Sequence, residues 1–180
     1  MANYVRGGLA DFPLPPYSFS SVVSAAFVLT ADDDQLQVVC DTFLNAPLGR
    51  AAGKKFVPGG DNRVIMVCST FPEAAAAPPQ PVGYSTYAEV TLLFSVFDHK
   101  NGVWGWYVPV LYLDGRRAGD QEWQAELPIA IGRELYGLPK VRAQLDLDPN
   151  TYAGTVQQID PATVGTPIKV SNHITISEGA

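Results

Sequence analysis

Alternating apolar and polar positions mark the middle of the chain as its clearest pair of strands. From Tyr84 to Phe97 (YSTYAEVTLLFSVF) every second residue falls on one apolar face, while the other face mixes aromatic, acidic and hydroxyl side chains. The Asn-Gly turn signal within 98–102 (DHKNG) predicts a hairpin that returns along 103–114 (VWGWYVPVLYLD). Pro109 inside the returning strand predicts a bulge or a sheet edge, because proline donates no ladder hydrogen bond.

The N-terminal part of the chain predicts a strand, a helix and a second strand. The first strand spans 21–30 (SVVSAAFVLT), and the helix spans 31–44 (ADDDQLQVVCDTFL), with aspartates at its N-terminal end where they cap the backbone and suit the dipole. The expected apolar face of this helix consists of Leu36, Val39, Cys40 and Phe43. Cys40 is expected in the core, since free cysteines are mostly buried. A short buried strand follows at 64–70 (VIMVCST).

The remaining segments predict a loop, a second helix and two further strands. Residues 72–83 (PEAAAAPPQPVG) predict a loop, because their prolines prevent the alanines from forming a helix. A helix is expected within 121–135, beginning near Pro128, and strands are expected near 154–158 and 167–176. Fifteen prolines and sixteen glycines divide the chain into short segments. The predicted fold is therefore α+β and mainly antiparallel β, with a few flanking helices.

Composition limits the class of protein and its partners. A chain of 180 residues with 47% hydrophobic residues can form one globular domain over 1–180. The net charge of −6 and the absence of a basic block argue against nucleic acid and membrane surfaces as partners. No secretory signal is recognisable at the start, so a cytoplasmic location is expected. The two cysteines and two histidines lack the spacing of a disulfide framework or a metal site.

Residues 129–141 (IAIGRELYGLPKV) carry the most specific pattern in the chain. Gly137 and Pro139 form a helix-stop signal, which presents Lys140 just beyond a helix end. The string GRELYGLPK resembles the GRE-x-x-G-x-PK signature of the acetoacetate decarboxylase superfamily, in which the lysine after the proline attacks a substrate ketone. A Tyr-x-Glu strand and then a tyrosine-rich strand precede the motif here, much as in the family. The resemblance covers roughly 15–156 and is strong only over 84–140.

This resemblance implies a fold, a site and a reaction type. The fold would be a cone-shaped or partial β-barrel with Lys140 at the base of a cavity. Lys140 would be the Schiff-base lysine, Glu89 the acidic residue facing it, and Tyr87 a neighbour on the same strand face. The ligand would be a small keto compound. The Schiff base would then lead either to loss of carbon dioxide or to aldol-type chemistry, with Glu89 or Tyr87 transferring protons. Because the iminium is the electron sink, neither a metal nor an organic cofactor is expected.

Several positions depart from the decarboxylase pattern. The second lysine of that pattern is replaced by Val141, although Arg142 would share a face with Lys140 if the segment is extended, and could supply a cation or bind the substrate. Val22 and Val23 stand where the decarboxylases carry an arginine for the substrate carboxylate, and 64–67 offers no second glutamate. These departures weaken the case for a β-keto acid. They leave open a non-catalytic protein that binds a small molecule in the family cavity.

Two further expectations concern the extent of the domain and the simplest alternatives for the site. The family pattern continues past Ala180, so the resemblance implies a domain shortened at its C-terminus and, because exposed strand edges would result, a homo-oligomer. Without the motif, Lys140 would be interpreted as a solvated lysine after a helix stop, and Glu89 as an outward-facing strand residue.

Overall fold

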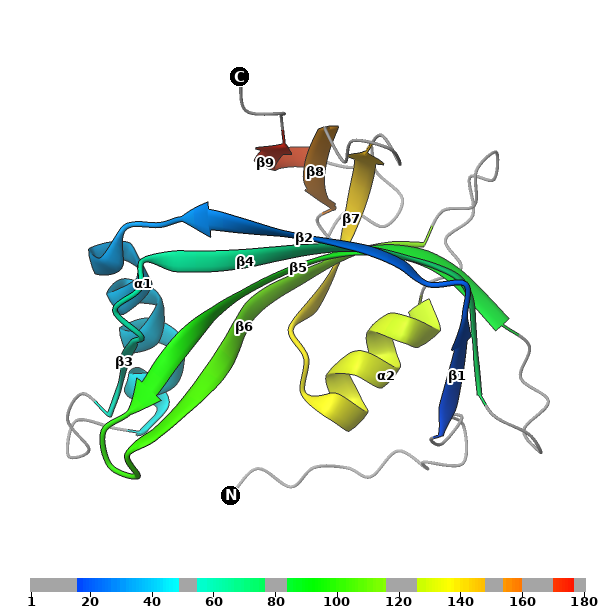
Figure 1. The fold of residues 1–180 in the computed structure, drawn as a ribbon. Helices are drawn as coiled ribbons and strands as arrows, with labels where there is room; N and C mark the ends of the chain where they lie inside the picture. The colour runs from blue at the N-terminus through cyan, green and yellow to red at the C-terminus, as the bar shows by residue number, and fades with distance from the viewer. Residues whose placement is uncertain are drawn as a thin grey trace.

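The computed structural model describes residues 16–48, 55–76, 84–115, 126–147, 154–159 and 170–176. Within them a sheet of nine strands is accompanied by two α-helices (Figure 1). The strands are β1 (Tyr17–Ser20), β2 (Val23–Thr30), β3 (Phe56–Pro58), β4 (Arg63–Ala76), β5 (Tyr84–Asp98), β6 (Val103–Asp114), β7 (Lys140–Leu147), β8 (Gly154–Ile159) and β9 (Val170–Ile176). The helices are α1 (Asp33–Val39), continued by a π-helix (Cys40–Asn45) and a 3₁₀ turn (Ala46–Leu48), and α2 (Glu126–Tyr136).

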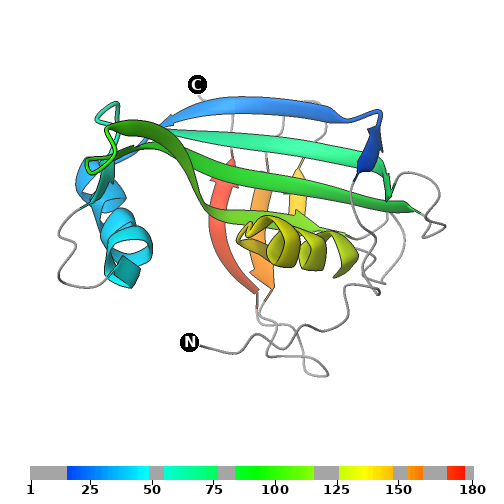
Figure 2. The same ribbon diagram turned by 90° about the horizontal axis from the view of Figure 1, so that it is seen from below.

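The sheet runs in the order β1-β4-β5-β6-β7-β8-β9, with β2 also paired to β4 and β3 to β5. All these pairs are antiparallel except β6 and β7, which are parallel and joined through α2, as a parallel pair requires a crossover. The predicted α+β, mainly antiparallel fold with few helices is confirmed. In the described residues the sheet is a partial barrel that does not close, and Figure 2 shows β7–β9 set at an angle to the long strands.

The β5–β6 hairpin confirms the strongest prediction from the sequence. Asp98 pairs with Val103, and Gly102 has a φ of 65°, which glycine adopts without strain. The predicted bulge at Pro109 is also confirmed, because the pairing shifts between Leu92 and Phe94 of β5, opposite this part of β6.

The predicted loop 72–83 is wrong over its first residues, since β4 continues to Ala76. The register between β4 and β5 shifts between Phe71 and Ala74, and Pro72 lies within that irregularity. Regular pairing is already interrupted there, so a residue without an N–H is tolerated. Beyond the shift, the alanines pair with β1. Prolines excluded a helix here without excluding a strand. Residues 77–83 lie outside the described residues.

The first helix begins as predicted, with the side chain of Asp32 accepting a hydrogen bond of 3.0 Å from the Gln35 N–H. Cys40 is fully buried, as expected, but Phe43 is 59% exposed, so its predicted place on the apolar face is wrong. The chain forms a π-helix from Cys40 onwards, and its wider turn rotates the later residues around the axis. Leu44 packs against the buried cluster instead.

The other boundaries shift by a few residues. The predicted strand 21–30 begins only at Val23, because Ser21 has a φ of 55° that separates β2 from β1. The second helix contains Pro128 in its first turn, as predicted. The two C-terminal strands are found as β8 and β9, with 167–169 outside the described residues.

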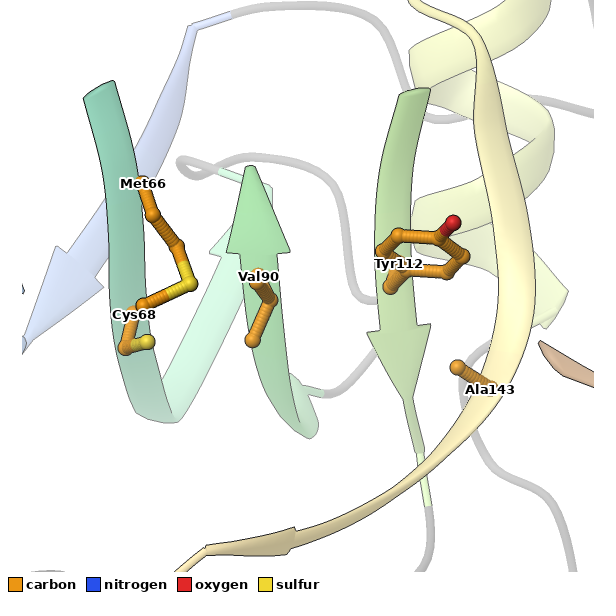
Figure 3. Packing of buried hydrophobic residues seen from close by; sticks show 5 residues of the cluster. All are labelled: Met66, Cys68, Val90, Tyr112 and Ala143. Atoms are coloured by element: carbon orange, nitrogen blue, oxygen red, sulfur yellow. The ribbon is translucent and has the colours of Figure 1, made fainter. Parts of the chain in front are cut away.

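Side chains on the two faces of the sheet form separate clusters. Figure 3 shows the buried cluster on one face, which consists of Met66, Cys68, Val90, Tyr112 and Ala143. The opposite face carries the cluster Tyr87, Leu111, Leu113 and Ile129, the last of these from α2. Residues on β5, β6 and β7 therefore alternate between the face of the first cluster and the face that α2 covers, where the candidate site lies. Figure 1 shows α2 against this side of the sheet.

Candidate active site

The turn between α2 and β7 places Lys140 at the start of a strand. Gly137, with a φ of 65°, ends the helix while its N–H still donates to the Arg133 carbonyl at 3.2 Å. The Leu138 N–H donates to the Gly132 carbonyl at 2.9 Å, which closes the turn. The Pro139 carbonyl accepts from the Leu111 N–H at 3.2 Å, so pairing with β6 begins immediately before Lys140.

The structure brings Lys140, Glu89 and Tyr87 together, as the sequence predicted. Lys140 Nζ lies 3.0 Å from Glu89 Oε2, and the two side chains are only 9% and 14% exposed. The same nitrogen lies 5.5 Å from the centroid of the Tyr87 ring. Glu89 also accepts a hydrogen bond of 3.2 Å from the Thr91 hydroxyl. The lysine therefore lies in a largely desolvated setting with a proton acceptor in contact.

Tyr87 is held in place by aromatic packing and remains a proton donor. Its ring stacks on Phe71 with the centroids 4.5 Å apart. Burial raises the pKa of the Tyr87 hydroxyl well above its ordinary value, and the nearby Glu89 carboxylate raises this pKa further. Tyr87 is thus protonated throughout the physiological range. Of the two predicted proton carriers, Glu89 is the one suited to accept a proton.

The pairing of β7 with β6 separates the two residues that follow Lys140. Lys140 and Arg142 lie opposite Leu111 and Leu113, on the face beneath α2, and Arg142 is half-buried there. Val141 lies opposite Tyr112 and packs into the cluster on the other face. Arg142, rather than the residue directly after the lysine, therefore shares the side of the sheet with Lys140. A substrate-binding role for Arg142, and a cavity at Lys140, stay predictions.

Ser24 and Ser69 lie in line with Glu89, a placement that sequence reasoning missed. Register places Ser24, Ser69 and Glu89 in one row across β2, β4 and β5. The two serine hydroxyls lie 2.8 Å apart. Val22, by contrast, precedes β2 and is exposed, and the correspondence of Val22 and Val23 to the family's arginine stays a prediction. The break at Ser21 sets the register that puts Ser24 in this row, and only the strand pairing reveals it.

The described residues contain no group of three or more histidine, cysteine or acidic side chains that could hold a metal ion. No helix within the described ranges is both long and apolar enough to cross a membrane.

The fold is of the acetoacetate decarboxylase kind. It is similar to the acetoacetate decarboxylase of Legionella pneumophila, with a TM-score of 0.51 and 18% identity, covering 88% of this chain and 55% of that one. A second acetoacetate decarboxylase structure gives a TM-score of 0.49 and 23% identity, covering 87% and 51%. The enduracididine biosynthesis enzyme MppR, solved with the condensation product of pyruvate and imidazole 4-carboxaldehyde, gives 0.48 and 16% identity, covering 81% and 50%.

This chain spans about half the length of those solved structures. At 18% identity the likeness to the Legionella protein shows a shared fold and leaves the chemistry to be argued from the residues themselves. No protein-family model matches the sequence, and no curated protein matches it significantly.

Proposed function

We propose that this protein is a Schiff-base-forming lyase that acts on a small keto compound, with Lys140 as nucleophile and Glu89 as proton acceptor. The observation that carries the proposal is the buried contact of 3.0 Å between Lys140 Nζ and Glu89 Oε2 on the face beneath α2. A lysine has an ordinary pKa of about 10.4 and attacks only when neutral. Glu89 is placed to take the proton that the amine must lose.

The first half of the reaction would form the iminium. The neutral Lys140 amine attacks the carbonyl carbon of the ketone, and the carbonyl oxygen is protonated to give a carbinolamine. Glu89 returns the proton that it took from the amine, the carbinolamine oxygen leaves as water, and the carbon–nitrogen double bond forms with a positive charge on nitrogen. The buried Tyr87 hydroxyl, which stays protonated, is a suitable donor for the developing oxygen charge.

The second half would break a carbon–carbon bond whose electron pair flows into the iminium to give an enamine. In a β-keto acid the leaving fragment is carbon dioxide. In a β-hydroxyketone it is an aldehyde, and Glu89 accepts the hydroxyl proton. Protonation of the enamine carbon and hydrolysis of the iminium then return the free lysine. Neither route needs a metal or organic cofactor, since the iminium itself accepts the electrons.

The side chains around Glu89 favour the hydroxyketone over the β-keto acid. Ser24 and Ser69 offer hydroxyl groups in the row that contains Glu89, where a carboxylate would need a cation. Burying a carboxylate without a partner costs several kcal/mol, and each 1.36 kcal/mol in the transition state is about tenfold in rate. Arg142 is the residue that could meet this charge. We therefore expect acetoacetate to be a poor substrate.

Borohydride trapping tests the proposal. The protein would be incubated with acetoacetate, with acetone or with a panel of hydroxyketones, reduced, and digested for mass spectrometry. We expect a stable adduct on Lys140 that Lys140→Arg abolishes. Lys55→Arg is the matched control, because Lys55 also pairs with a carboxylate, at 3.1 Å from Asp98 Oδ2. Labelling that follows only exposed lysines would refute the proposal.

Product assays distinguish the reactions. Carbon dioxide release from acetoacetate would be measured beside aldehyde release from the hydroxyketones. Fast decarboxylation that survives Arg142→Ala would show that the serine row does not restrict the substrate. A ligand that binds but leaves no reduced adduct would favour the second candidate, a non-catalytic binding protein, which the Lys140–Glu89 ion pair could also serve.

We also propose that the protein is a homo-oligomer in the cytoplasm. The outer edge of β2 supports the first part, because β2 pairs only with β4 among the described strands and exposes Val23 and Val28. Sedimentation at micromolar concentration tests it, and a stable monomer would contradict it.

A further inference from the structure

Gly132 lies in α2 at the point where the side chain of Lys140 passes the helix. A Cβ atom built on Gly132 would lie 2.5 Å from both Cδ and Cε of Lys140 and 3.2 Å from its Cγ. Carbon atoms in contact are ordinarily about 3.5–4.0 Å apart. The lysine stem therefore lies directly against the backbone of the helix, in space that any other residue would fill.

The position of Gly132 relative to Lys140 is fixed by the surrounding structure. The Gly132 carbonyl accepts the hydrogen bond of 2.9 Å from the Leu138 N–H, within the turn that leads to Lys140. Ile129, from the preceding turn of α2, is buried in the cluster that contains Tyr87 and Leu111. The helix is thus held both by the turn and by the strands that carry the site. A small local shift of the backbone therefore could not relieve the clash that a side chain at Gly132 would cause.

A methyl group at this position would displace the lysine and leave the helix in place. Its contacts would be with Cδ and Cε of a long side chain, which can change rotamer, whereas α2 is held by its packing. The same stem carries the amine that reaches Glu89 at 3.0 Å and lies over the Tyr87 ring. Moving the stem therefore moves the amine away from its proton acceptor.

We infer that Gly132 is a positioning residue for the Lys140 amine: its missing side chain makes the slot that holds the lysine stem and sets the amine against Glu89. The consequence for catalysis rests on the proposed function, but the placement of the amine does not. Glycine weakens a helix interior relative to alanine. The placement of the lysine gives a physical reason for glycine here.

Competitive acetylation tests the inference without any ketone. Wild type and Gly132→Ala would be treated with limiting acetic anhydride across a pH series, and acetylation of Lys140 would be measured by mass spectrometry relative to the exposed Lys100. We expect the acetylation of Lys140 to rise toward that of Lys100 and its pH profile to change. Lys55, which lies elsewhere, should be unaffected. Borohydride trapping should slow by about 100-fold, the cost of a misplacement of about 1 Å.

Gly105→Ala is the matched control. Gly105 lies in β6, and a Cβ there would meet only Val96 Cγ2 at 4.0 Å, an ordinary contact. This variant should leave Lys140 acetylation unchanged. If Gly132→Ala also leaves both acetylation and trapping unchanged, the inference is wrong. A change in acetylation in a protein whose wild type never traps a ketone would support the positioning of the amine and refute the proposed function.

A double-mutant cycle covers the case in which Gly132→Ala folds poorly. With Lys140→Ala the stem is absent, so Gly132→Ala should raise the melting temperature through its better helix propensity. In the presence of Lys140 the same change should lower the melting temperature. Equal effects in both backgrounds would show that Gly132 and Lys140 are not coupled, which would overturn the inference.

Discussion

Two lysines in this molecule each contact a carboxylate and an aromatic ring, at opposite ends of the long strands. Lys140 lies 3.0 Å from Glu89 and 5.5 Å from the Tyr87 ring centroid. Lys55 lies 3.1 Å from Asp98 and 4.6 Å from the ring centroid of Phe56. The first pair is beneath α2, and the second joins β3 to the β5–β6 turn. Distance alone does not distinguish them.

The difference lies in how the two carboxylates are used. Asp98 accepts hydrogen bonds from the Lys100 N–H at 2.9 Å and from the Asn101 N–H and Nδ2 at 3.2 and 2.7 Å. Burial would raise the pKa of Asp98, but the hydrogen bonds from Lys55, Asn101 and Lys100 outweigh it and lower this pKa. Asp98 is therefore committed to the hairpin. Glu89 has acceptor capacity beyond Lys140 and Thr91, which is what proton transfer requires.

The largest difference between the pairs should appear in stability. Glu89→Gln leaves the Lys140 ammonium buried beside a neutral amide, and removing one partner of a buried pair costs about 3–5 kcal/mol. We expect a loss of this size in the free energy of unfolding, measured in urea by tryptophan fluorescence. Asp98→Asn should cost less, because the lysine that loses its partner there is 20% exposed, against 9% for Lys140. The double variant Glu89→Gln with Lys140→Met should recover much of the loss, and no recovery would mean that burial of the ion is not its source.

Cysteine labelling can report on the Lys55 end of the molecule. Cys40 packs with Phe94 there, whereas Cys68 packs in the cluster on the face opposite the candidate site. Burial, with a smaller effect of Asp41, raises the pKa of Cys40 from 9.0 to about 11, and burial also raises the pKa of Cys68. At pH 8 the Cys40 thiolate is then about 100-fold scarcer than in an ordinary thiol, and iodoacetamide labelling should slow accordingly.

The sign of the pH effect on stability follows from the raised pKa of Cys40. Its contribution is fully present below pH 9.0 and is lost as the pH rises through about 11, because the unfolded thiol ionises first. Cys40→Ser should therefore flatten the fall in melting temperature over this window. Fast native labelling of Cys40 at pH 8 would show that this end of the molecule opens more readily than its packing implies.

The side-chain hydrogen bonds of Asn45 link the first helical segment to the residues around Lys55, far from the candidate site. Its amide nitrogen donates to Asp41 Oδ1 at 2.8 Å and to the Phe56 carbonyl at 2.9 Å, and its oxygen accepts from the N–H groups of Lys55 and Phe56 at 3.1 and 2.9 Å. Asn45→Ala leaves buried polar groups without partners, so it should cost about 1–3 kcal/mol. Lys140 acetylation should not change. A change there would show that the two regions are coupled.

The smallest expected effect is at Phe43, which the π-helix turns outward. Phe43→Ser should change the free energy of unfolding by less than about 0.5 kcal/mol, as exposed substitutions usually do. Leu44→Ala, one residue later and packed against the cluster at this end, should cost more. Thermal melts of both variants test whether the π-helix turns Phe43 outward and Leu44 inward. A larger loss for Phe43→Ser than for Leu44→Ala would support the α-helical face that the sequence predicted.

Prediction from sequence succeeded where the signal is local and failed where it depends on register. The alternation of β5 placed Tyr87 and Glu89 on one face, and the helix stop before Lys140 located the lysine. Ser24 and Ser69 escaped notice because they join Glu89 only through the pairing of three strands, which a one-residue break at Ser21 displaces.

The same distinction holds outside the site. The sequence of residues 31–44 does not indicate the π-helix, because the spacing of its apolar residues fits an ordinary α-helix as far as Phe43. Likewise, prolines in 72–83 signal where a helix cannot form, but the strand to Ala76 is decided by its partners β1 and β5. Strand β7 is similar: its pairing with β6 depends on a crossover that only the three-dimensional fold supplies.

The parallel β6–β7 pairing also orders events during folding. Residues of the β5–β6 hairpin are close in sequence and can pair early. Glu89 would therefore be in place within the hairpin before it contacts Lys140, which is 51 residues away in sequence. We expect that lysine to reach Glu89 only after the helical crossover has docked, as one of the later contacts to form. An adduct on Lys140 during refolding should therefore form only in chains in which α2 has docked. The rate of adduct formation would then report the docking of α2 rather than the formation of the sheet.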